Sequence, residues 1–367
     1  MLEPARWLAR SGLRVYLFGL GVRKFEAFRH LWSFRRLLEP GLMEERRVSL
    51  WNWLDYLKRG RTGLPPLEAG GFLARKASSH LRQRCEEADA IVCELPWLFS
   101  FAPMHPPRVL VAHNVEADLV AANPRATPSH RDRTERIEGE AWQGADAVIC
   151  FTREDRDRLA ERYGDRSAEV IPLGVDTERL RPAGPGERER ARVHLGVEDR
   201  FVALFTGSWH LPNRAALDRM VAWAESMEQD FLLVAAGSVG SQPRSGRNWR
   251  VTGMLPSLAD WFRAADCCVN PVTEGSGANV KVLEYMAWGL PVVSTPFGGR
   301  GLGTVEGEHL LVREPDQFPD TLRDLRRDPD RCGTLGAAGR TWVEAERSWS
   351  VLAEKRLAVL KKAAGRG

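Results

Sequence analysis

Short apolar runs alternate with polar segments of helical period along almost the whole chain. The apolar runs that predict strands lie at residues 13–21, 88–96, 108–114, 145–152, 201–209, 231–238, 267–272 and 290–295. The segments that predict helices lie at residues 5–12, 128–143, 153–164, 213–227, 257–266, 280–289 and 348–364. Apolar strands separated by helices are typical of parallel βαβ units, so the pattern predicts an α/β fold with doubly wound parallel sheets.

The alternation stops once and then restarts. Residues 176–200 are charged and rich in Pro and Gly, which is typical of a linker followed by a short helix. The sequence therefore predicts an N-terminal domain over 1–178, a second domain over 179–345 and a C-terminal helix over 346–367.

The N-terminus departs from the usual start of such a domain. A helical segment leads directly into the first strand, whereas a doubly wound domain normally opens with a strand and a glycine-rich turn. We expect the first βα unit to be missing or truncated, unless the start of the chain is assigned too late.

Composition narrows the class of protein. Hydrophobic residues make up 43% and charged residues 28% of the chain, which indicates a soluble globular protein. No apolar run is long enough to span a bilayer, and the run in residues 13–21 lacks a small-residue cleavage site, so a strand is preferred to a signal peptide. The six cysteines form no CxxC pair, which indicates buried free thiols and a cytoplasmic location.

Residues 22–62 are basic and aromatic. They contain ten Lys or Arg residues against five Asp or Glu residues, in a segment that we interpret as helical. Such a segment can lie peripherally on the anionic inner face of a membrane, or pack its aromatics into the core and expose its arginines. No helix-turn-helix, zinc or RNP-type signature indicates nucleic-acid binding.

The segment GSGANVKVLEYMAWG contains the most informative chemistry. A strand enters a turn with Gly275 and Gly277, and a helix leaves it with Lys281 and Glu284 three positions apart, on one face. Helix starts bind anions, and a carboxylate can accept hydrogen bonds from a vicinal diol. A phosphate beside a diol describes a nucleotide, whereas a surface ion pair over a structural turn is the alternative.

Three segments together resemble family 4 glycosyltransferases of the group 1 type. They are residues 145–182, residues 201–217, and the glycine-turn segment with LPVVST after it. Residues 109–119 also resemble the family's acceptor-side strand ending in histidine. The resemblance implies the retaining GT-B fold, with two Rossmann-like domains facing across a cleft. It also implies a nucleotide diphosphate sugar in the C-terminal domain, and a final helix that crosses back to the first domain.

The resemblance also implies roles for individual residues. His113, Lys281 and Glu284 would be the catalytic group, with His113 near the donor sugar and Glu284 on the ribose hydroxyls. Asn114 and Glu116 would lie on the acceptor side, although Glu116 can instead orient the histidine or cap the next helix. The donor-binding positions would be Gly207, Ser208, Arg214, Glu274, Gly275, Ser276, Gly277, Ala278 and Asn279.

The chain departs from the family pattern at two places. The first of two family glutamates would fall at Ser276, for which Glu274 can partly substitute. The basic pair that usually meets the diphosphate would fall at Ser208 and Asn213. The diphosphate still needs a cation, for which Lys281 is the preferred candidate and the others are Arg214, His210 and Arg300.

The expected reaction transfers a sugar from a UDP- or GDP-linked donor to a hydroxyl of a glycan, lipid-linked or small-molecule acceptor. We expect no metal and no further cofactor, because neither a metal-ligand cluster nor a convincing DxD element is present. The alternatives are a nucleotide-sugar epimerase on this fold and a non-catalytic binding protein. A nicotinamide-dependent dehydrogenase would need a G-x-G-x-x-G motif that the N-terminal half lacks.

Overall fold

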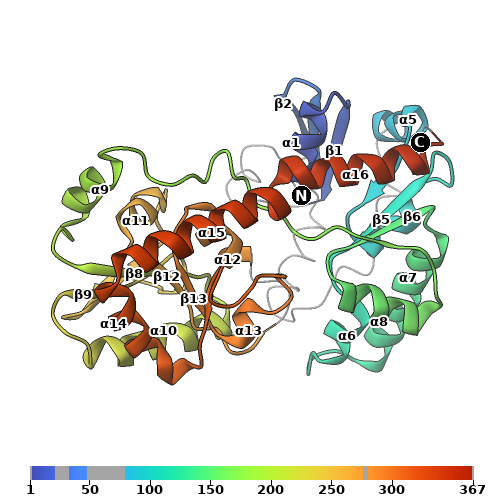
Figure 1. Cartoon of the computed structure of the whole chain (residues 1–367). Coiled ribbons are helices and arrows are strands. Elements are labelled where there is room, and N and C mark those ends of the chain that lie inside the picture. The colour runs from blue at the N-terminus through green and yellow to red at the C-terminus, as the bar shows by residue number, and fades with distance from the viewer. Residues whose placement is uncertain (1, 21–32, 48–78, 276–279, 366–367) are drawn as a thin grey trace. The chain divides into compact units, whose positions relative to one another are not determined.

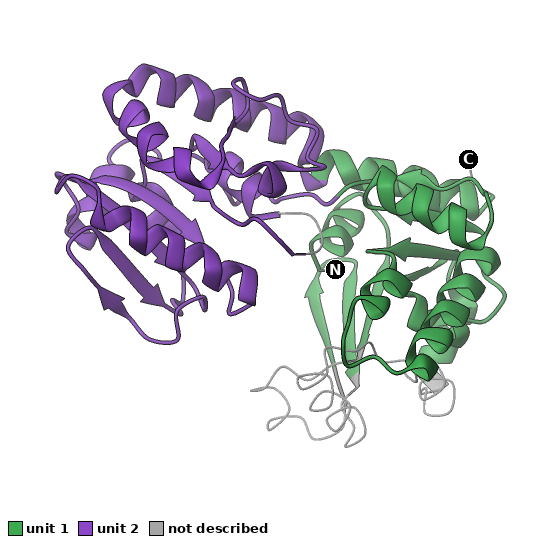
Figure 2. Cartoon of the chain, turned by 90° about the horizontal axis from the view of Figure 1, so that it is seen from below, with its two compact units in different colours: residues 1–172, 350–367 green, residues 173–349 purple. Residues whose placement is uncertain are grey.

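The computed structural model describes residues 2–20, 33–47, 79–275 and 280–365. The chain divides into two compact units (Figure 2). Unit 1 contains residues 1–172 and 350–367, and unit 2 contains residues 173–349. Most of the C-terminal helix α16 (Trp349–Ala363) is therefore part of the N-terminal unit.

Unit 2 is built around a seven-stranded sheet with the order β10-β11-β9-β8-β12-β13-β14. Every neighbouring pair is parallel except β10 with β11. The strands are β8 (Phe201–Thr206), β9 (Phe231–Ala236), β10 (Arg244–Ser245), β11 (Trp249–Gly253), β12 (Cys267–Asn270), β13 (Val292–Ser294) and β14 (Leu311–Val312).

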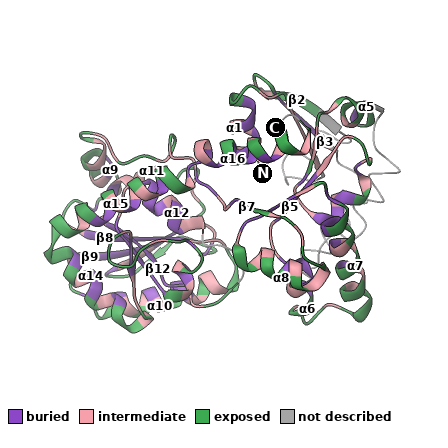
Figure 3. Cartoon of the chain, turned by 45° about the vertical axis from the view of Figure 1, so that its right-hand side comes forward, coloured by how far each residue is buried: buried purple, intermediate pink, exposed green. Residues whose placement is uncertain are grey.

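Helices cover both faces of this sheet (Figures 1 and 3). On one face Leu204 packs in a core with Phe262 and Leu283, and on the other Phe205 packs with Leu217 and Phe318. Every residue of β8 is buried because alternate side chains enter the two cores, which explains the continuous apolar run in the sequence. The helices are α9 (Glu187–Leu195), α10 (Leu211–Glu225), α11 (Ala259–Ala264), α12 (Val280–Ala287), α13 (Pro296–Gly299), α14 (Phe318–Arg327) and α15 (Pro329–Arg347), with 3-10 turn η2 (Pro315–Gln317).

Unit 1 contains a four-stranded parallel sheet with the order β4-β5-β6-β7. Its strands are β4 (Ile91–Cys93), β5 (Arg108–Ala112), β6 (Ala147–Cys150) and β7 (Glu169–Val170). The core beside it is built around Trp142, Phe99 and Leu110. The structure also describes the helical elements α1 (Leu2–Arg10), α5 (Ser79–Glu87), η1 (Pro96–Phe101), α6 (Glu116–Ala121), α7 (Pro128–Gly144) and α8 (Arg153–Tyr163) in this unit.

The first strand does not join that sheet. β1 (Val15–Leu20) pairs in parallel with β3 (Leu42–Arg47), which pairs antiparallel with β2 (Ser33–Glu39). Residues 13–21 do contain a strand, but among the described residues the main sheet of unit 1 starts at β4 and does not include β1.

The helical interpretation of residues 22–62 was also wrong where the structure describes them. Residues 33–47 form a hairpin that turns at Gly41, whose φ of +81° is a conformation that favours glycine. Arg35 lies opposite Glu45 and Arg36 opposite Glu44, with N–O distances of 2.7 and 2.6 Å. Opposite charges directly across two strands favour this pairing. The other residues of the segment lie outside the described part of the chain.

Two further predictions concern membrane-spanning helices and the cysteines. None of the helices that the structure describes combines the length and hydrophobicity needed to cross a bilayer. All six cysteines are free; four are buried, and Cys85 and Cys332 are half-buried.

Candidate functional site

The glycine turn and the loop after β8 meet at one edge of the unit 2 sheet. β8 and β12 are parallel neighbours, with Cys267 opposite Ala203. The loop that leads from β8 to α10 and the loop that leads from β12 to α12 therefore both leave from the carboxyl ends of adjacent strands. In open α/β sheets ligands bind at this edge.

Lys281 reaches across this edge from α12 to α10. Its Nζ donates a hydrogen bond of 2.7 Å to Asn213 Oδ1 and lies 4.5 Å from the centroid of the Phe205 ring. Asn213 Nδ2 in turn donates to the carbonyl and to the hydroxyl of Ser208, both at 3.2 Å. Ser208 and Asn213, which stand where the family usually has a basic pair, thus form a hydrogen-bonded network that supports Lys281.

The charge of Lys281 is not neutralised by a direct ion pair with any carboxylate of the described residues. Burial lowers the pKa of Lys281 to about 8, against the opposing charge of Glu284. Lys281 is also the one lysine between Lys76 and Lys355, in a chain that otherwise uses arginine there. A desolvated ammonium group held by a neutral amide is suited to receive an anion.

Glu284 lies one helical turn after Lys281 on α12. Burial raises its pKa, while the charges of Arg179 and Lys281 act in the opposite direction. In the described part of the chain its carboxylate has no hydrogen-bond partner, so both oxygens can accept hydrogen bonds from a ligand.

The loop before α12 is described in part. Glu274 and Gly275 are exposed, and Gly275 has a φ of +131°, which a residue with a side chain rarely adopts. Arg219 of α10 holds the start of the loop by donating to the Pro271 carbonyl at 3.1 Å and to Thr273 Oγ1 at 2.9 Å. Four predicted donor-binding residues lie outside the described part: Ser276, Gly277, Ala278 and Asn279.

The remaining donor-side candidates have different environments. The carbonyl of Gly207 accepts a hydrogen bond from the Val239 N–H at 3.0 Å, which joins the β8 loop to the β9 loop. Ser208 accepts hydrogen bonds from Asn213, which supports Lys281. Arg214 is exposed near the start of α10 and has no side-chain partner among the described residues.

Tyr285 is a residue of this edge that the sequence interpretation missed. It is fully buried, and its hydroxyl accepts from the Thr206 N–H at 2.8 Å and lies 2.9 Å from Thr206 Oγ1. It therefore joins α12 to the end of β8, at the point where the site begins. An aromatic residue directly after Glu284 gave no sign of this role, because a buried tyrosine looks like any core residue in the sequence.

Tyr285→Phe is expected to destabilise unit 2 by about 1–3 kcal/mol, because it leaves the buried Thr206 N–H without its acceptor. Thermal unfolding followed by circular dichroism measures the effect. A melting temperature equal to that of the wild type would show that the hydroxyl does not contribute to holding α12 on β8.

In unit 1, His113 comes directly after β5 and is surrounded by side chains from neighbouring strand ends. Its Nε2 lies 2.9 Å from Oε2 of Glu94, which follows β4, and its ring centroid lies 4.6 Å from that of Phe151, which follows β6. The other oxygen of Glu94 lies 3.2 Å from the guanidinium of Arg356, on α16. Sequence reasoning found His113 but missed Glu94 and Arg356.

The two acceptor-side candidates begin the next helix. Glu116 is the first residue of α6, and its Oε1 accepts a 3.5 Å hydrogen bond from Asn114. Burial raises the pKa of Glu116, opposed by Asn114 and by His113. Glu138 accepts hydrogen bonds from the N–H groups of Glu116 at 2.6 Å and of Ala117 at 3.1 Å, so it is Glu138 that caps α6. No hydrogen bond joins Glu116 to His113 among the described residues.

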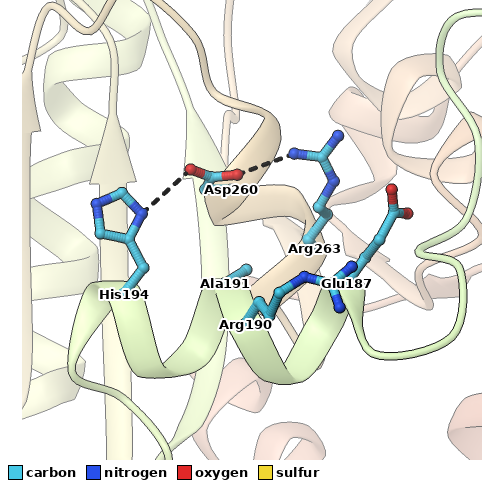
Figure 4. A pocket seen from close by; sticks show the side chains of 6 residues that line it. All are labelled: Glu187, Arg190, Ala191, His194, Asp260 and Arg263. Carbon is cyan, nitrogen blue, oxygen red and sulfur yellow. Dashed lines mark hydrogen bonds and ion pairs between the residues drawn. The ribbon is translucent and has the colours of Figure 1, made fainter.

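Unit 2 also has a hollow of about 350 Å³ between α9 and α11 (Figure 4). Asp260 of the lining lies between His194 and Arg263, 2.9 Å from Arg263 and 3.4 Å from His194. Its lining shares no residue with the Lys281 edge, and the other acidic residue of the lining, Glu187, pairs with Arg181 outside it. The described residues contain no group of three or more His, Cys, Asp or Glu side chains placed to hold a metal ion.

Two family models match the chain. The one described as "Glycosyltransferase Family 4" matches residues 1–179, and the one described as "Glycosyl transferases group 1" matches residues 200–328. The two matches fall on successive parts of the chain, and the second includes Lys281 and Glu284.

Curated relatives agree with these families. A GDP-mannose-dependent monoacylated alpha-(1-6)-phosphatidylinositol monomannoside mannosyltransferase of Corynebacterium glutamicum is 29% identical over 59% of this chain and 62% of its own length. A D-inositol 3-phosphate glycosyltransferase of Catenulispora acidiphila is 32% identical over 61% of this chain and 59% of its own length. The chain thus spans about three fifths of the length of these relatives.

Solved structures share the fold. The Anabaena protein HepE in complex with UDP superposes with a TM-score of 0.68 at 13% identity, over 98% of this chain and 95% of that one. A glycosyltransferase of Rickettsia africae gives a TM-score of 0.68 at 13% identity, over 100% and 94%. These similarities confirm the predicted fold class, an α/β fold of two Rossmann-like units of the GT-B type. The two family matches, which together cover most of the chain, show that the chain belongs to the group 1, family 4 glycosyltransferases.

Proposed function

We propose that the protein transfers a sugar from a nucleotide diphosphate sugar to a hydroxyl group, with retention of the anomeric configuration. The observation that carries the proposal is the pair Lys281 and Glu284 at the carboxyl edge of the unit 2 sheet. Lys281 offers a desolvated cation that pairs with no carboxylate of the described residues, and one turn away Glu284 offers two oxygens that accept no hydrogen bond from those residues. In a nucleotide the diphosphate lies next to the ribose diol. A cation suits the diphosphate, and a carboxylate one helical turn away suits the diol.

In this proposal Lys281 neutralises the charge that develops on the leaving diphosphate, which lowers the barrier to departure. Glu284 accepts hydrogen bonds from the ribose hydroxyls and so fixes the nucleotide along α12. Ser208 and Gly275 contact the phosphates and the sugar in this proposal. In unit 1, we assign His113 to the sugar and Asn114 and Glu116 to the acceptor.

The donor and the acceptor class are also part of the proposal. A protein of this fold binds UDP, and one of the two relatives is named for GDP-mannose. We therefore propose a UDP- or GDP-linked donor and no further cofactor. The relatives' names include phosphatidylinositol mannosides and inositol 3-phosphate, so we propose a polyhydroxyl acceptor, lipid-linked or small, at the inner face of the membrane.

The experiment that tests the reaction is the transfer itself. The full chain is incubated with UDP- and GDP-sugars and a panel of inositol, phosphatidylinositol and oligosaccharide acceptors, and the products are examined by NMR. We expect one donor to give a glycoside with the anomeric configuration of the donor. An inverted glycoside would contradict retention. Consumption of the donor into an epimerised sugar, with no acceptor modified, would favour an epimerase instead.

A further inference from the structure

His113 is the last member of a chain of three polar side chains that come from distant parts of the sequence. Glu94 follows β4, His113 follows β5, and Arg356 lies in the middle of α16. Each oxygen of Glu94 has its own partner, because Oε2 lies 2.9 Å from His113 Nε2 and Oε1 lies 3.2 Å from Arg356. The carboxylate cannot turn toward one partner without losing the other.

The surrounding residues further restrict the movement of Glu94, His113 and Arg356. Arg356 is only 3% exposed, and Glu94 is 17% exposed at its side chain. The ring of Phe151 packs against His113 at 4.6 Å between centroids, and the Arg356 guanidinium lies 5.9 Å from the centroid of the same ring. His113 and Arg356 therefore both contact Phe151, which leaves the imidazole little freedom to rotate.

The charge of Glu94 decides which nitrogen of His113 carries the proton in the neutral ring. Burial raises the pKa of Glu94, but the hydrogen bond with His113 and the charge of Arg356 outweigh it and hold the pKa below the usual carboxyl value. An ionised carboxylate only accepts hydrogen bonds, so Nε2 must donate. Nδ1 then carries the lone pair, and it has no hydrogen-bond partner among the described residues.

We propose that Glu94 and Arg356 are positioning residues that fix His113 as its Nε2–H tautomer, so that Nδ1 accepts a hydrogen bond from a hydroxyl of the bound sugar. In this form His113 recognises a hydroxyl donor and not a phosphate oxygen, which has no proton to give. The C-terminal helix is then a component of the acceptor-side site, because it supplies the buried cation that holds Glu94. The inference rests on the proposed function only for the identity of the hydroxyl.

An ion pair that merely fastens α16 to unit 1 is the simpler interpretation. It requires Glu94 and Arg356 but leaves His113 free to adopt either tautomer. The two interpretations therefore differ in the protonation of the His113 ring, which does not depend on whether any sugar is transferred.

The test uses long-range proton–nitrogen NMR spectra of the histidine rings in the ¹⁵N-labelled full chain, at about pH 8. His113→Gln identifies the His113 signals. The variants are Glu94→Leu and Arg356→Met, with Glu94→Gln and Arg356→Lys as conservative replacements that retain an acceptor or a cation. Lys355→Met, on an exposed neighbour in α16, is the matched control. The kcat for transfer of the sugar from the donor and the Kd for a nucleoside diphosphate are measured for each variant.

We expect the wild type and Lys355→Met to show the Nε2–H tautomer, and Glu94→Leu and Arg356→Met to show a mixture of tautomers. The kcat should fall by about tenfold to a hundredfold in these two variants, with the nucleoside diphosphate Kd unchanged, because the imidazole is misplaced and the donor loop is not. Glu94→Gln and Arg356→Lys should restore part of the Nε2–H tautomer and part of the kcat. These two variants test the positioning role if Glu94→Leu and Arg356→Met do not fold.

An unchanged Nε2–H tautomer in Glu94→Leu and Arg356→Met, or in the conservative pair if these are unfolded, would overturn the proposal. An unchanged kcat beside a changed tautomer would overturn the role in transfer. If no donor is turned over at all, the proposed function fails, while the tautomer measurement still decides the positioning role.

Discussion

Lys281→Met is expected to weaken the binding of a nucleoside diphosphate by about ten- to hundredfold. A hydrogen bond to a charged group contributes about 1.5–3 kcal/mol, and each 1.4 kcal/mol is about a factor of ten in Kd. The same change should raise the stability of the ligand-free protein, because it removes a desolvated charge that pairs directly with none of the carboxylates that the structure describes. Calorimetric titration and thermal unfolding measure the two effects.

The pH dependence follows from the same group. Burial lowers the pKa of Lys281 to about 8 in the folded chain, below the ordinary lysine value of 10.5. Its destabilising effect is therefore full at neutral pH and disappears as the pH rises from about 8 to about 10.5. A bound diphosphate requires the protonated form, so binding at about pH 9 should take up close to one proton from the buffer.

Titration of the wild type in buffers of different ionisation enthalpy gives that proton uptake. Lys281→Met should take up none at this site, and Lys355→Met, which loses an exposed lysine, should behave like the wild type. Equal affinity in Lys281→Met and the wild type would show that the diphosphate does not meet this lysine. A lower stability of ligand-free Lys281→Met would contradict a destabilising, desolvated charge at this position.

Glu284→Ala should lower the affinity for a nucleoside diphosphate by about a hundredfold, because it removes two acceptors for charge-assisted hydrogen bonds to the ribose. The role is identified with 2′-deoxy and 3′-deoxy nucleotides. In the wild type, removal of either hydroxyl should weaken binding by about tenfold or more. In Glu284→Ala the same removal should have almost no effect, since the acceptor is already gone.

The control for this cycle is Glu225→Ala, which removes an exposed carboxylate at the far end of α10. It should leave both the affinity and the discrimination between ribose and deoxyribose unchanged. If Glu284→Ala loses affinity but still distinguishes the deoxynucleotides to the same extent, then Glu284 acts on Lys281 or on the helix and does not bind the ribose.

The sequence predicted unit 2 well because its strands are buried on both faces. β8, β9 and β12 appear as continuous apolar runs, and residues 280–289 show a helix that the glycine turn introduces. The position of Lys281 and Glu284 on one helical face follows from their spacing alone. Short-range patterns are sufficient for these features.

Other features depend on contacts that are distant along the chain. The hairpin at residues 33–47 looks basic and helical until Arg35 and Arg36 are seen opposite two glutamates. The partners of His113 could not be predicted either, because Arg356 is 262 positions from Glu94. Each of these charged residues has the ordinary appearance of a surface residue in the sequence.

The mismatch with the family pattern also has a physical explanation in unit 2. The sequence showed that Ser208 and Asn213 stand where the family usually has a basic pair, but not what they do. In the structure Asn213 accepts the hydrogen bond from Lys281, and Ser208 orients Asn213. We infer that one lysine on α12, supported by a neutral amide, takes the place of the basic pair.

The central claim is that the β12–α12 edge of unit 2 binds a nucleotide diphosphate, and a titration tests it most directly. UDP, GDP, ADP and TDP are titrated by calorimetry into the full chain, with thermal unfolding as the second readout, because a ligand of the native state raises its melting temperature. We expect one of the four to bind, and Lys281→Ala and Glu284→Ala each to weaken it. Binding of none of the four, or binding that both substitutions leave unchanged, would contradict the claim.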